Sequence, residues 1–139
     1  MIEESHLLLD THVALWFFEN ADVLSPSIKK RIEAAASNDS ILISAITVWE
    51  IALLNAKKRI KIDRPIEEYV IQIVEAPGVK LIPLSPEISC LSVGLSNFQK
   101  DPADRIIVAT SLINKVPLVT RDRRIIEYPR MKNLVVPID

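Results

Sequence analysis

Short apolar runs alternate along this chain with segments of helical periodicity, and this alternation constrains the fold more than any other feature. Three helix starts are sharply marked, because a capping side chain precedes a proline in Ser25-Pro26, Ser85-Pro86 and Asp101-Pro102. Proline is favoured at the first helical position, where its missing N–H would have no partner within the helix. We therefore expect helices to begin at these three points, with strands in the apolar runs between them.

The remaining elements follow from the spacing of apolar residues. Runs dominated by Leu, Ile and Val predict strands at Leu7–Leu9, Ile41–Ile43, Val79–Ile82, Leu118–Thr120 and Leu134–Val136. Helical spacing predicts two further helices, one capped by Ser44 and running to about Ala56, and one from Pro65 to Ala76. Strands that alternate with helices favour a parallel sheet between two helical layers. The expected fold is a single three-layer α/β/α domain over residues 6–137, with a mainly parallel central sheet.

The composition is that of one globular domain with a balanced charge. The chain has 139 residues, of which 49% are hydrophobic and 25% charged, and its formal net charge is −1. This balance excludes bulk electrostatic attraction to nucleic acid, so any such binding needs local basic patches. The candidate patches are Lys57, Lys58, Arg59 and Lys61, and Arg121, Arg123 and Arg124. The first patch can equally be a solvated helix end, where cations meet the helix dipole favourably.

The sequence predicts a cytoplasmic protein. Its longest apolar stretch, Ile41 to Leu54, is interrupted by Glu50 and is too short to span a bilayer. The segment Met1–His6 has two glutamates where a secretory signal has basic residues. The single cysteine, Cys90, cannot form an intrachain disulfide, and we expect it to be a small core residue.

Acidic residues follow two of the expected strands directly. Asp10 comes after Leu7–Leu9, and Asp122 lies just beyond Leu118–Thr120. Ligands bind outside the carboxyl ends of the strands in open parallel sheets, so both carboxylates should point into one crevice if these strands are neighbours. Taken singly, each acid can also be a plain N-cap, and the same holds for Asp101.

Two more acids need separate explanations. Asp104 falls three residues after Asp101, where it can complete a capping box, although Glu or Gln is usual there. Glu50 lies inside an apolar helix with no cation nearby in the sequence. A buried carboxylate is costly, so Glu50 needs a metal ion, a distant cation or exposure in a cleft. A solvent-facing Glu50 is the main alternative.

Together the four acids predict a divalent-metal site. Asp10, Glu50, Asp104 and Asp122 offer only hard oxygen ligands, which suit Mg²⁺ or Mn²⁺ and not zinc. Carboxylates crowded into one pocket would repel each other strongly without a cation. Such sites typically serve phosphoryl chemistry.

The segments that contain these acids resemble the PIN-domain ribonucleases, and within them the toxins of VapBC-type toxin–antitoxin systems. The first two segments read Leu-Leu-Leu-Asp-Thr-His and Ser-Ala-Ile-Thr-Val-Trp-Glu-Ile-Ala-Leu-Leu, and they contain Asp10 and Glu50. The third reads Asp-Pro-Ala-Asp-Arg-Ile-Ile-Val-Ala and contains Asp104. The fourth reads Thr-Arg-Asp where the family commonly has Thr-Asn-Asp, so Arg121 replaces the Asn and Asp122 is kept. The order and spacing of all four make the combination specific.

The resemblance implies a PIN-like fold and Mg²⁺- or Mn²⁺-dependent cleavage of RNA phosphodiesters. On this interpretation Asp10 and Asp104 are the principal metal ligands, and Glu50 and Asp122 complete the shell or act through water. The side chains expected around the acids are Thr11 and Thr120 as hydrogen-bond supports, and Arg105 and Arg121 as possible contacts to carboxylate or phosphate. For Arg105 a structural ion pair is an equal alternative, and Asp101 is interpreted as the cap.

The resemblance also implies partners. These are an RNA substrate such as a tRNA or ribosomal RNA loop, a cognate antitoxin whose C-terminal segment blocks the acidic site, and a second copy of the chain in a homodimer. Trp16, Phe17 and Phe18 can stack on bases, but on a short helix they are better explained as core or as a groove for a partner.

Two rival interpretations are weaker. Asp10 lacks the second Asp two residues later that haloacid-dehalogenase-like phosphatases use, and no Lys closes the strand Leu118–Thr120 as in a receiver domain. A non-catalytic PIN-like scaffold that only binds protein or RNA would have no need of a repulsive acidic pocket.

Overall fold

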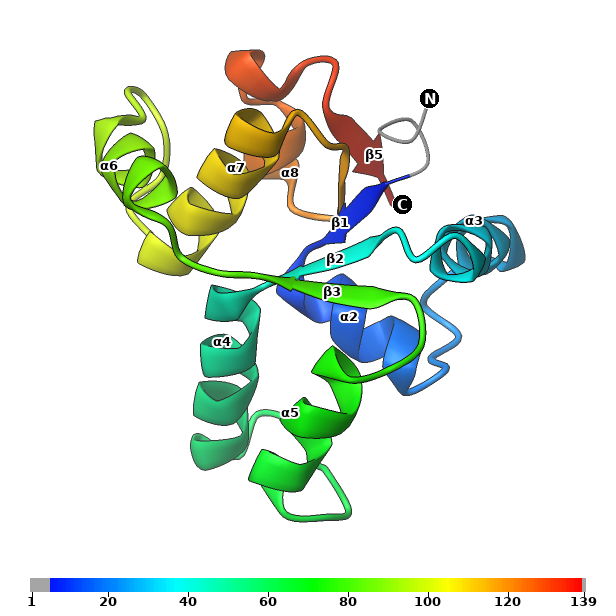
Figure 1. Ribbon diagram of the computed structural model, residues 1–139. Coiled ribbons are helices and arrows are strands. Elements are labelled where there is room, and N and C mark those ends of the chain that lie inside the picture. The colour runs from blue at the N-terminus through cyan, green and yellow to red at the C-terminus, as the bar shows by residue number, and fades with distance from the viewer. Residues whose placement is uncertain (1–5, 139) are drawn as a thin grey trace.

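The computed structural model describes residues 6–138, in which five parallel strands form a central sheet (Figure 1). The strands are β1 (Leu7–Leu9), β2 (Ile41–Ser44), β3 (Val79–Ile82), β4 (Leu118–Thr120) and β5 (Val135–Pro137). Their order in the sheet is β3-β2-β1-β4-β5, and every neighbouring pair is parallel. The predicted α/β fold with a parallel sheet is therefore confirmed. The order also makes β1 and β4 neighbours, so the acids that follow them end at the same edge.

Helices cover both faces of this sheet. They are α2 (Thr11–Phe18), α3 (Pro26–Ser37), α4 (Ala45–Ala56), α5 (Ile66–Val74), α6 (Pro86–Gly94), α7 (Pro102–Asn114), α8 (Arg123–Ile126) and a 3₁₀ turn (Pro129–Met131). The three proline-marked starts are found as predicted, and each capping oxygen accepts a backbone N–H. Helix α5 ends two residues before the predicted Ala76, since Pro77 disfavours helical geometry in the residue before it.

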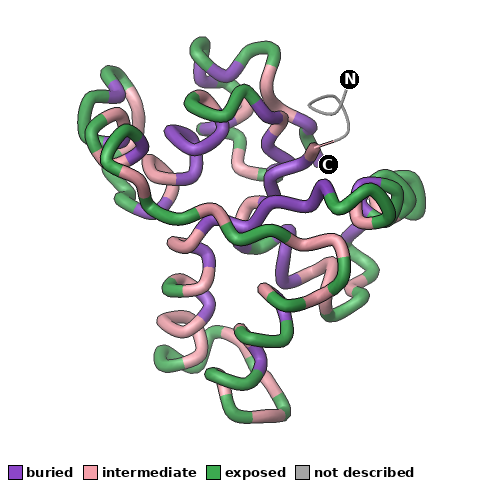
Figure 2. Tube along the Cα trace, in the orientation of Figure 1, coloured by how far each residue is buried: buried purple, intermediate pink, exposed green. Residues whose placement is uncertain are grey.

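The sheet packs through alternating side chains. Leu7 and Leu9 face one layer, where they meet Val13 of α2 and Ile32 of α3. Leu8 faces the other layer and belongs to a separate cluster with residues of α7 and α8. Figure 2 shows the resulting line of buried chain through the central strands. The central strands are buried on both faces, which explains why their sequence is continuously apolar.

Helices α4 and α5 extend the first layer beyond the sheet (Figure 1). Ile51 of α4 and Tyr69 and Ile73 of α5 are buried together with Leu15 of α2 in a third apolar cluster. This cluster holds α4 beside α2, so that a residue in the middle of α4 can reach the end of β1.

Gly78 fixes the start of β3. Its φ of +86° lies in the left-handed region, and its carbonyl accepts a 3.0 Å hydrogen bond from Ile41 N. A Cβ at this position would lie 2.2 Å from the Ala36 carbonyl oxygen. Both the backbone conformation and the close approach therefore require glycine.

Two predictions have different outcomes. Cys90 is exposed on α6 instead of buried, because the helix turns Ile88 and Ser92 inward at that point. The prediction about a secretory signal falls on Met1–Ser5, which lie outside the described residues. Within residues 6–138, no helix has the length and apolar character needed to cross a bilayer.

Candidate active site

The four predicted acids line one cavity of about 460 Å³ beside the carboxyl ends of β1 and β4. Asp10 directly follows β1, and Asp122 lies two residues beyond β4. Asp104 comes from the first turn of α7 and Glu50 from the middle of α4. The cavity thus collects carboxylates from four segments that are far apart in the sequence.

Asp10 is held by two threonines. Its Oδ1 accepts a 2.9 Å hydrogen bond from Thr11 N, and its Oδ2 accepts a 2.7 Å bond from Thr120 Oγ1. Thr120 Oγ1 in turn accepts the backbone N–H of Asp122 at 3.0 Å, so one buried hydroxyl links the two strand-end acids. Burial raises the pKa of Asp10, and the bonds from Thr120 and Thr11 offset only part of this effect.

Glu50 turns into the cavity from α4. Its Oε1 accepts a hydrogen bond from Thr11 Oγ1, which also lies 3.0 Å from Thr47 Oγ1. Burial raises the pKa of Glu50, and the nearby charge of Asp10 raises it further. The partner of this carboxylate is thus a neutral hydroxyl. Among the described residues, no cation lies at ion-pair distance from it.

Asp104 has a strongly raised pKa. Burial and the charges of Asp10, Asp101, Glu50 and Asp122, in that order, raise its pKa from 3.8 to about 7. Its backbone N–H donates a 3.1 Å hydrogen bond to Asp101 Oδ1. Asp101 is therefore the N-cap of α7, and its side chain also lines the cavity.

Gln99 bridges two of the acids, and sequence reasoning missed it. Its Nε2 donates to Asp104 Oδ2 at 3.0 Å and to Asp122 Oδ2 at 3.4 Å. Its Oε1 is buried and has no hydrogen-bond partner within residues 6–138. A single Gln in a loop gives no signal in the sequence, since only the fold brings it between α7 and the end of β4.

Asp122 differs from the other acids because it has a cationic partner. Arg124 donates to it through Nε at 3.2 Å, through a terminal guanidinium nitrogen at 3.1 Å and through the backbone N–H at 2.9 Å. Burial raises the pKa of Asp122, but these bonds outweigh burial and leave the pKa below its ordinary value. The same guanidinium lies 3.8 Å from Asp104.

Arg105 points away from the acids. Its guanidinium donates to the backbone carbonyls of Ser92, Val93, Leu95, Phe98 and Gln99, at distances from 2.6 to 3.2 Å. The predicted contact with a carboxylate or an ion pair is not found among the described residues; the side chain instead fixes the loop that contains Gln99. Arg121 does line the cavity, as an exposed side chain.

The donor set fits a hard divalent cation. All four acids offer oxygen, and burial together with the charges of neighbouring acids raises the pKa of Asp10, Glu50 and Asp104, so a bound cation would relieve their mutual repulsion. No three His, Cys, Asp or Glu side chains within residues 6–138 are close enough, as they stand, to hold one ion together. Mg²⁺ usually binds through one or two carboxylates and keeps several waters, so it does not need a denser cluster.

Comparison with known proteins identifies relatives over nearly the whole chain. The sequence profile of the PIN domain matches residues 7–131. Ribonuclease VapC22 of Mycobacterium tuberculosis (strain ATCC 25618 / H37Rv) is 36% identical over 120 residues, which cover 86% of this chain and 88% of that protein.

Solved structures support the same fold. The complex VapBC2 from Rickettsia felis, bound to a DNA fragment from its promoter, includes a chain that matches with a TM-score of 0.70 at 17% identity, covering 96% of this chain and 98% of that one. A toxin–antitoxin complex from Klebsiella pneumoniae includes a chain that matches with a TM-score of 0.62 at 24% identity, covering 94% and 95%.

Proposed function

Since this chain belongs to the PIN-domain family, we propose that it is a metal-dependent endoribonuclease and the toxin of a toxin–antitoxin pair. The proposal rests above all on one observation, the convergence of Asp10, Glu50, Asp104 and Asp122 on a single cavity. The similarity to a ribonuclease over most of the chain supports the same activity. We assign this activity to one domain over residues 6–137.

Asp10 and Asp104 would hold the metal ion, with Glu50 and Asp122 contributing directly or through water. Bound Mg²⁺ or Mn²⁺ would supply Lewis acidity, which favours hydroxide over water and neutralises charge on the phosphate. Thr120 keeps Asp10 turned into the cavity by its hydrogen bond to Oδ2. Because burial and the neighbouring acids raise the pKa of Asp104 to about 7, metal binding at this carboxyl would compete with its protonation in the neutral range.

The rest of the site would orient the acids and the RNA. Gln99 holds Asp104 beside Asp122, and Arg124 neutralises Asp122 so that the two acids can lie close together. Arg121 is an exposed cation at the cavity and is available to an RNA phosphate. We further expect a cognate antitoxin, a homodimer and a cytoplasmic location.

The experiment is cleavage of a pool of structured RNAs by the purified protein in Mg²⁺, in Mn²⁺ and in EDTA. Discrete metal-dependent products are expected from the wild type, and Asp10→Asn and Asp104→Asn should abolish them. Asp39→Asn is the control, because Asp39 is exposed and its φ of +54° suits Asn as well as Asp. Absence of cleavage together with absence of metal binding by calorimetry would favour a non-catalytic scaffold.

A further inference from the structure

Trp16 joins the acidic cavity to a second pocket. This second pocket, here called the basic pocket, has a volume of about 300 Å³ and lies between α2 and the segment that follows α4. His12, Leu15, Trp16 and Glu19 line it from α2, and residues 59–62 line it from the other side. Trp16 and His12 line both cavities, so the two cavities lie next to each other, and they are here together called the track.

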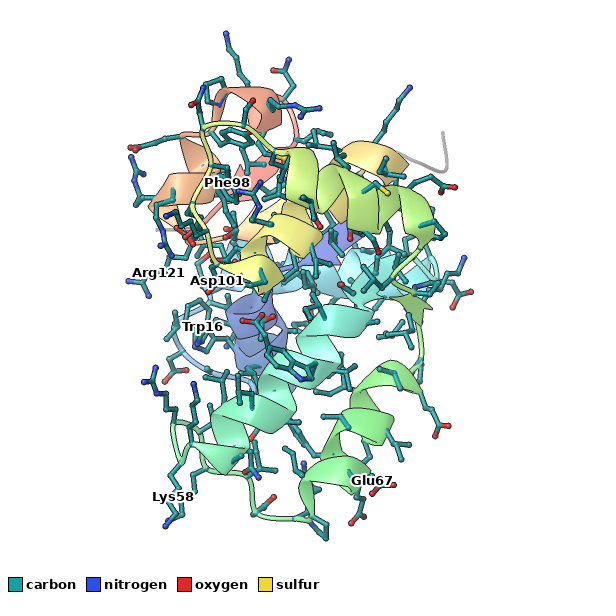
Figure 3. The ribbon with its side chains drawn as sticks, turned by 90° about the vertical axis from the view of Figure 1, so that its left-hand side faces the viewer. Trp16, Lys58, Glu67, Phe98, Asp101 and Arg121 are labelled. Atoms are coloured by element: carbon teal, nitrogen blue, oxygen red, sulfur yellow. The ribbon has the colours of Figure 1, made fainter. Side chains whose placement is uncertain are left out.

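Trp16 packs against the same apolar cluster as Phe17, but its ring also contacts charged and polar side chains at the cavities. Phe17 and Phe18 pack against separate apolar clusters, and their rings meet edge to face. The half-buried Trp16 in addition has the Arg121 guanidinium 5.8 Å from its ring centroid and the His12 ring at 5.9 Å. Figure 3 shows Trp16 between Arg121 and Lys58 along one edge of the molecule. Its ring thus lies between the acidic site and the basic end of α4.

Three cations along this track have no acidic partner in the part of the chain that the structure describes. Arg121, Arg59 and Lys61 are exposed, and no carboxylate within residues 6–138 lies at ion-pair distance from them. Glu19 is the acidic residue that lines the basic pocket, and its carboxylate already accepts a 2.8 Å hydrogen bond from Tyr69. The track therefore presents unpaired positive charge on either side of an aromatic ring.

We infer that this track binds an unpaired RNA segment next to the cleaved bond, with one base stacked on Trp16 and its flanking phosphates on Arg121 and on Arg59 and Lys61. A base can stack on an aromatic ring only when it is unpaired and has left its place in an RNA helix. Cations beside the ring are suited to bind the phosphates that flank such a base. This inference rests on the proposed ribonuclease function and narrows its substrate to RNA that is single-stranded beyond the cleavage site.

The direct test is the fluorescence of Trp16 in protein that binds RNA without cleaving it. The chain has two tryptophans, so Asp10→Asn combined with Trp49→Phe leaves Trp16 as the sole reporter. A mixed-sequence single-stranded RNA oligonucleotide should quench this fluorescence, and the same sequence as a duplex should not. Asp10→Asn with Trp16→Phe is the matched control, since it reports only on Trp49, which is 57% exposed on α4 and lies outside the track.

Substitutions test the two parts of the site separately in the Asp10→Asn background. Trp16→Leu should weaken binding of the oligonucleotide by roughly 5- to 150-fold, the range for loss of one stacked base, while Trp16→Phe should keep most of the affinity. Arg59→Gln with Lys61→Gln should reduce the slope of log affinity against log salt by about 1.4, or 0.7 for each phosphate contact.

A second charge pair controls for bulk electrostatics. Lys30→Gln with Arg31→Gln removes the same number of exposed cations from α3, and should leave the salt slope unchanged. Equal slopes for the two double variants would overturn the inference. The inference would also be overturned if RNA quenched the fluorescence of Trp49 and not that of Trp16. The same holds if an antitoxin peptide quenched Trp16 and RNA did not. If the wild type itself cleaves no RNA, the proposed function fails first; if it cleaves and the track variants bind normally, only this inference fails.

Discussion

Replacing Asp104 with Asn should make the metal-free protein more stable above neutral pH. Asp104 shares its cavity with four other carboxylates, and burial together with their charges raises its pKa to about 7. A carboxyl with a raised pKa in the folded state stabilises the fold only while it is protonated. The wild type should therefore lose stability as the pH rises from about 4 through 7, whereas the Asn variant should lose less, because only Asp10 and Glu50 keep a raised pKa there.

The size of the effect follows from the two pKa values. The difference between 3.8 and about 7 corresponds to at most about 4 kcal/mol in the free energy of unfolding, at 1.36 kcal/mol per pKa unit. The side chain of Asp104 is only 15% exposed, so solvent screening reduces this value little. The neighbouring acids can take up protons when Asp104 ionises, so this contribution to the free energy of unfolding is an upper limit.

The assay is urea unfolding in EDTA at pH 5 and at pH 8, for the wild type, Asp104→Asn and Asp101→Asn. Asp101→Asn removes one charge from the same cavity and keeps a side chain that caps α7 equally well, so it should retain most of the pH dependence. Addition of Mg²⁺ at pH 8 should stabilise the wild type and have less effect on Asp104→Asn. Parallel stability curves for the wild type and Asp104→Asn in EDTA would refute the argument.

Three other substitutions test the supports of the fold and the site. Gly78→Ala should destabilise the protein by more than about 1 kcal/mol, because φ is +86° and the new Cβ would meet the Ala36 carbonyl; thermal unfolding measures this, and an unchanged Tm would contradict it. Arg105→Lys should lower the free energy of unfolding by about 2 to 4 kcal/mol in a urea titration, because an ammonium group cannot reach five carbonyls at once. A loss under about 1 kcal/mol would show that Arg105 does not hold the loop that contains Gln99. Thr120→Val removes the 2.7 Å hydrogen bond to Asp10 at nearly constant volume and should raise the pKa of Asp10 further. Calorimetry should then show weaker Mg²⁺ binding near neutral pH, and the affinity should recover at higher pH. An Mg²⁺ affinity that does not depend on pH would exclude this link.

Local sequence was enough to predict the five strands and most of the helices of this fold, but not α8 or the 3₁₀ turn at Pro129–Met131. Capping side chains followed by proline determine where α3, α6 and α7 begin, because those hydrogen bonds involve residues only a few positions apart. Continuous apolar runs determine the strands, because a strand buried on both faces has no polar side to alternate with. The position of Asp10 and Asp122 beyond two strand ends follows directly from that reading.

Only the tertiary structure decided how the side chains of the site are paired. Glu50 meets Thr11 because the packing of α4 against α2 brings together residues that are 39 positions apart. The loop before α7 folds back over that helix. It therefore places Gln99 between two acids and turns Arg105 toward backbone carbonyls of the loop. Periodicity and capping report contacts within a few residues, whereas these partners are selected by long-range packing that no local pattern records.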